Sequence, residues 1–207
     1  NIFCPGLGDL GVHVPYCEKK CSFCYCDTII TQDSDQVDLY VKGLRAELLR
    51  MATTLRGVPV HTVYFGGGTP TVLPIALLRG LLEDIRTHFT LADDVHLNME
   101  ATPFSMTRQL AIVLAEYGTD RVTLGIQSND PGILAAVNRT QSFGQVTAAV
   151  EALREAGVPY INFDLVGGLP DDTEERFADG FAGLLDLEPD MVHVYPYSPV
   201  GGAQRSP

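Results

Sequence analysis

Short apolar runs alternate with segments of helical period along almost the whole chain, and this rhythm constrains the fold more than any other feature. In the longest helical segment, from Val37 to Met51, apolar residues recur at i, i+3, i+4 and i+7. Strands that each lead into a helix pair in parallel with one another. The rhythm therefore predicts an α/β fold with a parallel sheet. The six expected strands are Leu10–Val14, His61–Phe65, Val95–Glu100, Arg121–Gln127, Tyr160–Val166 and Met191–Tyr197.

Helix starts and stops are also visible in the sequence. Ser34 is the expected N-cap of the first helix, because Ser is a favoured capping residue and the apolar period begins just after it. Breaks at Gly57-Val58-Pro59 and Gly157-Val158-Pro159 precede two of the expected strands. Further helices are expected at about 74–90, 105–118, 143–156 and 173–186.

Each predicted strand has one apolar and one polar face. Ile161, Phe163 and Leu165, for example, alternate with Asn162 and Asp164. Strands buried on both faces read as continuous apolar runs, so here helices are expected on one face only. A closed eight-stranded barrel fills its lumen with aliphatic side chains and takes ~250 residues, whereas this chain has 207. The pattern favours an open, partial TIM barrel of six βα units around a polar ligand.

Composition excludes several classes of protein. The chain has 14 basic and 26 acidic residues, a net charge of −12, which argues against binding nucleic acid or anionic lipid mainly through charge. It has no run of ~18 apolar residues for a membrane span. No basic segment of the signal-peptide type opens the chain, and the initiator Met is lacking, so residues before Asn1 are expected. We expect a cytoplasmic protein without a nucleic-acid or membrane partner.

Four of the five cysteines fall within ten positions, which favours reduced thiols gathered for a metal over a disulfide scaffold. Cys17, Cys21 and Cys24 directly follow the first predicted strand. Thiolates favour zinc, Cu(I) or iron–sulfur clusters, and three of them can hold three irons of a [4Fe–4S] cluster and leave the fourth open. The alternative is zinc with Cys26 or His13 as fourth ligand, although the second C-x2-C pair of a typical zinc knot is missing.

The other two cysteines are less informative. Cys26 is open as a ligand, a redox thiol or simply a small residue. Cys4 lies away from the group, and no role is expected for it.

Polar residues at strand ends suggest a ligand site. Gly66-Gly67-Gly68-Thr69-Pro70 lies between a strand and a helix, where glycine lets amide N–H groups approach an anion. A dinucleotide site would instead need G-x-G-x-x-G after the first strand. Carboxylates at the strand ends can pair with an ammonium or accept ribose hydroxyls, and an arginine fork suits a carboxylate. The strand-end candidates are Glu100, Gln127 and Asp164, and Arg139 is the candidate arginine.

These motifs together resemble a known family. The segment HVPYCEKKCSFCYC resembles the signature of radical S-adenosylmethionine (SAM) enzymes. The additional Cys26 and the preceding His-Val-Pro resemble one branch, the oxygen-independent coproporphyrinogen III oxidases and their relatives. Motifs similar to that branch follow in the same order along the chain: YFGGGTPT, NMEATP, RVTLGIQS, VNRTQ and NFDLVGGLPDDT.

The resemblance implies cofactors and site residues. It implies a [4Fe–4S] cluster on Cys17, Cys21 and Cys24, and one or two molecules of SAM. Phe23 and Tyr25 are expected to shield the cluster, and no catalytic acid or base is assigned. His13, His193, Tyr195 and Tyr197 are expected to face the lumen. The residues expected to contact SAM are Gly67, Gly68, Thr69, Glu100, Gln127, Arg139, Asp164 and Ser198.

The resemblance also implies a reaction: reductive cleavage of SAM to a 5′-deoxyadenosyl radical, with an electron from a donor such as flavodoxin or ferredoxin, acting on a small-molecule substrate. The chain departs from the branch at Gly11, where the oxidases carry a tyrosine. This departure favours methylation or cyclopropanation of an sp² carbon in a natural product, with a second SAM as donor. The alternatives are coproporphyrinogen decarboxylation and, in another class, a non-catalytic metal-binding or haem-trafficking module. Residues 1–207 are interpreted as one radical SAM core domain, without the family's C-terminal substrate region.

Overall fold

Six parallel strands form the body of the fold, as the sequence predicts. The computed structural model describes residues 1–4, 6 and 8–198. Its sheet has the order β1-β2-β3-β4-β5-β6-β7, so it is open, with β1 and β7 at its two edges. Strands β2 to β7 are parallel, and β1 runs antiparallel to β2. The strands are β1 (Ile2–Phe3), β2 (Asp9–Val14), β3 (Val60–Gly67), β4 (Leu91–Ala101), β5 (Arg121–Gln127), β6 (Tyr160–Gly167) and β7 (Met191–Pro196).

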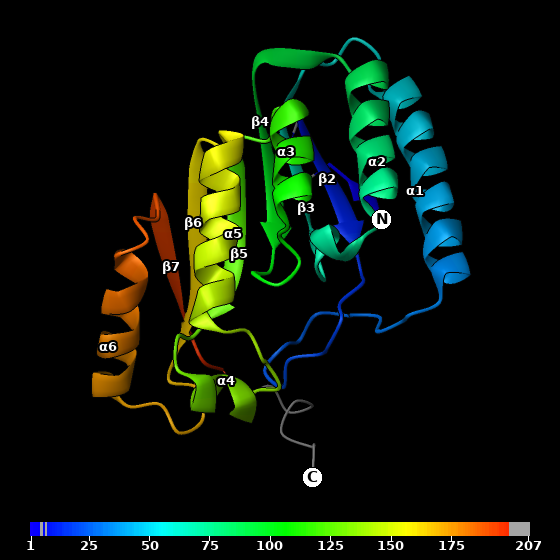
Figure 1. The fold of residues 1–207 in the computed structure, drawn as a ribbon. Coiled ribbons are helices and arrows are strands. Elements are labelled where there is room, and N and C mark those ends of the chain that lie inside the picture. The colour runs from blue at the N-terminus through cyan, green and yellow to red at the C-terminus, as the bar shows by residue number, and fades with distance from the viewer. Residues whose placement is uncertain (5, 7, 199–207) are drawn as a thin grey trace.

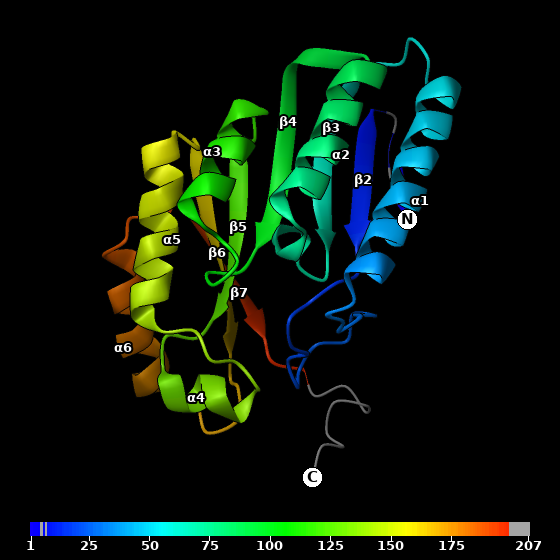
Figure 2. The ribbon, with the colours of Figure 1, turned by 45° about the vertical axis from the view of Figure 1, so that its right-hand side comes forward.

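The long helices cover one face of the sheet (Figures 1 and 2). Side chains from that face, such as Phe65, Val122 and Phe163, are fully buried between sheet and helices. The short helix α4 lies instead at the end of the sheet where the parallel strands stop. The helices are α1 (Ser34–Thr54), the 3₁₀ turn η1 (Pro70–Val72), α2 (Ile75–His88), α3 (Arg108–Glu116), α4 (Pro131–Ala136), α5 (Phe143–Ala156) and α6 (Glu174–Leu185).

The opposite face of the sheet is polar and only partly covered, which confirms the open partial barrel. Thr123, Asp164 and Glu100 are half-buried on this face. Strand β7 departs from the expected pattern, because Val194 on its apolar face is 50% exposed. As an edge strand it has one neighbour, and α6 contributes only Leu184 as a fully buried residue. The apolar side of β7 is therefore incompletely covered.

Some boundaries differ from the sequence prediction. Asp33, rather than Ser34, caps α1, because its Oδ1 accepts from the amides of Asp35 and Gln36 at 3.0 and 3.3 Å. Helix α3 begins at 108 instead of 105, since the Thr107 side chain caps it. Helices α2 and α6 are slightly shorter than expected. Neither β1 nor α4 was predicted, because two and six residues are too few to show a period.

Within the described residues, helices that combine the length and apolar character needed to cross a bilayer are absent.

Candidate functional site

A cavity of about 400 Å³ opens at the carboxyl ends of the strands. Four parts of the chain meet there: the loop after β2 that carries the cysteines, the glycine-rich turn after β3, the ends of β4, β5 and β6, and the segment after α4. Ser198 is exposed and does not line the cavity. The other predicted site residues all line it: Cys17, Cys21, Cys24, Gly67, Gly68, Thr69, Glu100, Gln127, Arg139 and Asp164.

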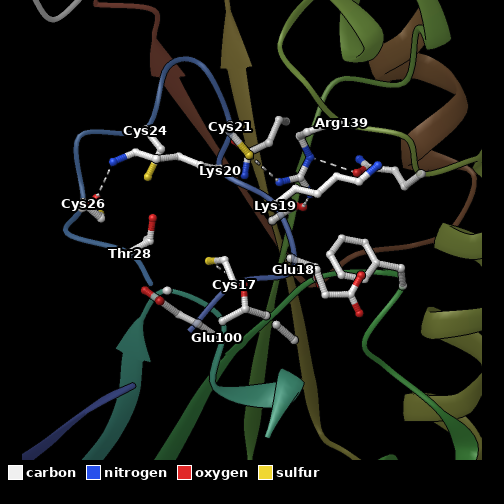
Figure 3. A pocket seen from close by; sticks show the side chains of 18 of the residues that line it. Cys17, Glu18, Lys19, Lys20, Cys21, Cys24, Cys26, Thr28, Glu100 and Arg139 are labelled. Carbon is white, nitrogen blue, oxygen red and sulfur yellow. Dashed lines mark hydrogen bonds between the residues drawn. The ribbon is translucent and has the colours of Figure 1, made fainter. Parts of the chain in front are cut away.

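The cysteine loop presents half-buried thiols to this cavity (Figure 3). Cys17 Sγ lies 3.4 Å from Thr69 Oγ1, which joins the loop to the glycine-rich turn. Burial raises the pKa of the Cys17 thiol, and burial together with neighbouring Cys24 raises that of Cys26 to about 11. Cysteine binds a metal as the thiolate, so metal binding must displace the proton of each ligating thiol.

The side chains that line the cavity suit an iron–sulfur cluster better than a single metal ion. In the part of the chain that the structure describes, no three His, Cys, Asp or Glu side chains converge closely enough to hold a single metal ion. The loop brings Cys17, Cys21 and Cys24 to one cavity, and each iron of a cluster takes its own thiolate. Thr28 Oγ1, which also lines the cavity, is buried and has no hydrogen-bond partner among the described residues. The cavity thus combines soft sulfur donors with a polar atom available to a ligand.

The glycine-rich turn does not offer amide N–H groups to an anion, which corrects the sequence-based expectation. The Gly67 amide donates to Glu100 Oε2 at 3.1 Å. The Gly68 amide donates to the carbonyl of Val14, the last residue of β2, and the Thr69 amide donates to the Tyr16 carbonyl, both at 2.7 Å. Because these hydrogens are engaged within the chain, the turn can offer a ligand carbonyl oxygens, which suit a cationic group.

Two acidic side chains face the same cavity. Glu100 accepts hydrogen bonds from the Tyr64 hydroxyl and from the Gly67 amide. Burial raises its pKa, the negative charge of Asp164 adds to the shift, and the two hydrogen bonds partly oppose it. Burial likewise raises the pKa of Asp164, opposed by His193, whose Nδ1 lies 3.1 Å from Asp164 Oδ1. A positively charged ligand would stabilise the ionised forms of these two partly buried carboxylates, so the site favours a ligand with positive charge.

The raised pKa of Glu100 predicts how stability depends on pH. Between Glu's usual pKa of about 4.3 and the raised one, the folded chain holds a proton that the unfolded chain has released. The free energy of unfolding should therefore fall as pH rises through this window, and Glu100→Gln should remove that part of the slope. Urea unfolding of the ligand-free protein at a series of pH values measures it. The exposed control Glu151→Gln should keep the wild-type slope, and a slope unaltered in Glu100→Gln would contradict the assignment.

Gln127 and Arg139 reach the cavity in different ways. Gln127 lies at an irregularity in the pairing of β5 with β6 and has a φ of 73°, which is uncommon for a residue other than glycine. Such backbone conformations persist where the surroundings hold them, often at sites. Arg139 is only 8% exposed, and its guanidinium donates to Cys21 Sγ, to a main-chain carbonyl of β5 and to Gln141.

The histidines and aromatic residues expected at the lumen or around the cluster lie in different surroundings. The imidazole of His193 pairs with Asp164, and that of His13 lies beside Gly67. Phe23 lines the cavity and packs, as Tyr197 does, against a small apolar cluster between α4 and β6. Tyr25 is 81% exposed and does not line the cavity, and its expected role as a shield of the cluster stays a prediction.

The sequence interpretation missed several contributors to the site. Tyr64 donates a hydrogen bond to Glu100, the Thr28 hydroxyl has no partner in the part of the chain that the structure describes, and Gln141 and Asn138 border the cavity. Only Tyr64 carried a usable signal, because it and Glu100 lie on the polar faces of neighbouring strands. The contact at Gly11 was not predicted either: the Phe3 ring of β1 occupies the position that a side chain at residue 11 would take.

The comparisons with known proteins agree with this geometry. The Radical SAM superfamily matches residues 12–180. The oxygen-independent coproporphyrinogen III oxidase of Bradyrhizobium diazoefficiens is 36% identical over 92% of this chain and 43% of the relative. A haem chaperone of Mycobacterium tuberculosis is 34% identical over 89% of this chain and 48% of the relative. The chain thus spans less than half the length of these curated relatives.

Solved structures give the same result for the fold. Coproporphyrinogen III oxidase from Escherichia coli, a radical SAM enzyme, superposes with a TM-score of 0.89 at 32% identity, covering 94% of this chain and 46% of that one. A radical SAM methyltransferase from Kitasatospora setae gives a TM-score of 0.68 at 18% identity, covering 95% and 36%, which shows a common fold. The family match over residues 12–180 and the 36% identity to the Bradyrhizobium oxidase agree with the cysteine loop, the glycine-rich turn and the acidic strand ends gathered on one partial barrel, and this chain belongs to the Radical SAM superfamily.

Proposed function

We propose that Cys17, Cys21 and Cys24 hold the [4Fe–4S] cluster and that the remaining cavity residues hold SAM. The observation that carries this assignment is that one cavity is lined by these three thiols, the glycine-rich turn and two carboxylates of raised pKa. SAM contains an ammonium and a sulfonium, which the two carboxylates and the carbonyls of the turn suit. The cluster, when bound, supplies the electron for cleavage of SAM to methionine and a 5′-deoxyadenosyl radical.

The chain's own residues orient SAM and limit its contact with water. Glu100 is held in place by Tyr64 and Gly67, so it presents a fixed carboxylate to an ammonium. Asp164 and Gln127 stand on the two neighbouring strands, within reach of other polar groups of the same ligand. We expect the electron to come from a one-electron donor such as flavodoxin or ferredoxin.

For the substrate, we propose oxidative decarboxylation of a propionate side chain of a coproporphyrinogen. The two oxidases described above are 36% and 32% identical to almost the whole chain, whereas the methyltransferase is similar only in fold. The similarities therefore favour decarboxylation over the methyl or methylene transfer that Gly11 had suggested. In this reaction the radical removes a hydrogen atom from the propionate, and loss of CO₂ and of one electron to an oxidised one-electron carrier, such as a flavodoxin or ferredoxin, leaves a vinyl group.

Isotope labelling tests this choice. The reconstituted protein is incubated under anaerobic conditions with coproporphyrinogen III, dithionite and SAM deuterated in its methyl group. We expect release of CO₂ and 5′-deoxyadenosine without deuterium. Deuterium in 5′-deoxyadenosine would instead support methylene transfer. SAM cleavage without CO₂ release would overturn the proposed substrate while leaving the cofactor assignment intact.

The haem chaperone relative supports one further candidate, a role in haem trafficking. In that case the protein should bind haem and should leave coproporphyrinogen unchanged. Absorption spectroscopy of the purified protein with added haem, run beside the decarboxylation assay, separates the two functions.

A further inference from the structure

Arg139 is a buried cation whose contacts include a cysteine sulfur. It follows α4 in sequence and is 8% exposed. Its Nη1 donates to Cys21 Sγ at 3.4 Å, as the dashed line in Figure 3 shows. Cys21 is one of the three residues proposed to hold the cluster. The arginine and this thiol are 118 positions apart in the chain, so the fold alone brings them together.

The guanidinium is fixed in place by main-chain and amide groups. Nη2 donates to the Gly125 carbonyl at 2.5 Å, and Nε donates to Gln141 Oε1 at 2.9 Å. Gln141 is 5% exposed and in turn donates from Nε2 to the Ile126 carbonyl. All three guanidinium nitrogens are therefore engaged, and the end of β5 anchors the whole arrangement.

Residues 137–141, the segment that carries Arg139, form two more hydrogen bonds with the cysteine loop. The Asn138 side chain donates from Nδ2 to the Lys20 carbonyl at 2.8 Å. The Ser22 amide donates to the Val137 carbonyl at 3.2 Å. Residues 137–141 thus hold the part of the loop around Cys21, as the glycine-rich turn holds the part around Cys17.

The charge of Arg139 lacks an acidic partner within the described residues. Five other arginines there, among them Arg45, Arg108 and Arg176, form ion pairs with carboxylates, and Arg139 does not. Burying a cation without a counter-charge is costly. The contact with Cys21 indicates where the compensating negative charge belongs. A [4Fe–4S]²⁺ core bound by three thiolates has a net charge of −1, and its one-electron-reduced form has −2.

We infer that Arg139 is a positioning residue that sets the reduction potential of the cluster, through its charge and its N–H···S hydrogen bond to Cys21. Net charge and hydrogen bonds to the sulfurs are known determinants of cluster potentials. In the reduction, dithionite donates one electron, the core passes from the 2+ to the 1+ state, and no bond breaks. The added negative charge beside a fixed guanidinium is stabilised, so Arg139 raises the potential. The inference rests on the cluster assignment and is independent of the substrate.

A dye-mediated redox titration followed by electron paramagnetic resonance tests this inference on reconstituted protein without SAM. We expect Arg139→Gln to lower the midpoint potential, so that the ratio of reduced to oxidised cluster at a fixed potential falls at least ~10-fold, about 59 mV for one electron. Arg139→Lys keeps a positive charge but loses the planar fork, so its midpoint potential should lie between those of the wild type and Arg139→Gln. The control Arg108→Gln, on an exposed ion pair with Glu155, should keep the wild-type midpoint.

Two results would overturn the inference. If Arg139→Gln has the wild-type midpoint and only its SAM affinity falls, Arg139 serves the carboxylate of SAM instead. If Arg139→Gln fails to retain iron, Arg139→Lys is used for the test. A midpoint potential of Arg139→Lys at or above that of the wild type would exclude a role of Arg139 in setting the potential. Because no substrate takes part, failure here is distinguishable from failure of the proposed decarboxylation.

Discussion

Replacing Cys17, Cys21 or Cys24 with alanine, one at a time, should remove the cluster iron and lower the rate of SAM cleavage at least ~100-fold. Each thiolate holds one iron, so the loss of any one of them leaves the cluster incompletely bound. Iron content after anaerobic reconstitution and the yield of 5′-deoxyadenosine measure the effect. The three thiols lie half-buried on a loop, so the metal-free variants should unfold near the unfolding temperature of the metal-free wild-type protein.

Cys4 and Cys26 are the matched controls in the same chain. Cys4 is exposed and away from the cavity, and Cys4→Ser should keep both iron and activity. Cys26 lines the cavity, and Cys26→Ser should also keep them if three cysteines suffice. Loss of metal in Cys26→Ser would instead support the four-ligand zinc site that the sequence left open.

Gly68→Ala should have the second large effect. A Cβ at this position would lie 2.5 Å from the Tyr16 carbonyl oxygen and 2.8 Å from the carbonyl carbon of Pro15, both in the main chain. The Gly68 amide donates to Val14 at the end of β2 and the Thr69 amide donates to Tyr16, so the turn is held close and must move away from the start of the cysteine loop to admit the methyl group. We expect a loss of about 1–3 kcal/mol in the free energy of unfolding. We also expect SAM affinity to fall at least ~10-fold, equivalent to about 1.4 kcal/mol.

Gly43→Ala is the control for this change. Gly43 lies in the middle of α1, and a Cβ there would meet no atom within 4 Å. Alanine should therefore stabilise the protein by roughly 0.5–1 kcal/mol through its higher helix propensity. Urea unfolding and calorimetric titration with SAM measure both variants. Wild-type stability together with wild-type SAM affinity in Gly68→Ala would show that the turn is not tightly packed.

The parallel sheet was predictable because its signal is local and repeated. The alternation of polar and apolar residues in β5 and β6 gave both the strands and the face on which Asp164 stands. Glu100 could be placed in the same way at the end of β4. The antiparallel strand β1 could not, since two residues show no period and its pairing depends on chain reversal before β2.

The contacts within the site were much harder to foresee. The contact of Arg139 with Cys21 joins residues 118 positions apart through a short helix that has no clear periodic signal. The amides of the glycine-rich turn were expected to be open to an anion, but they donate to Glu100 and to main-chain carbonyls at and just after the end of β2. Cysteine spacing, strand patterning and the family resemblance together predicted which residues gather at the cavity, while their hydrogen-bond partners depended on the assembled fold.

Cleavage of SAM by the reconstituted protein tests the central assignment most directly. The protein is loaded with iron and sulfide under anaerobic conditions, reduced with dithionite and supplied with SAM, and 5′-deoxyadenosine is quantified by mass spectrometry. The account predicts 5′-deoxyadenosine from the wild type and its loss in Cys24→Ala. A wild-type protein that carries an intact [4Fe–4S] cluster and forms no 5′-deoxyadenosine would contradict it.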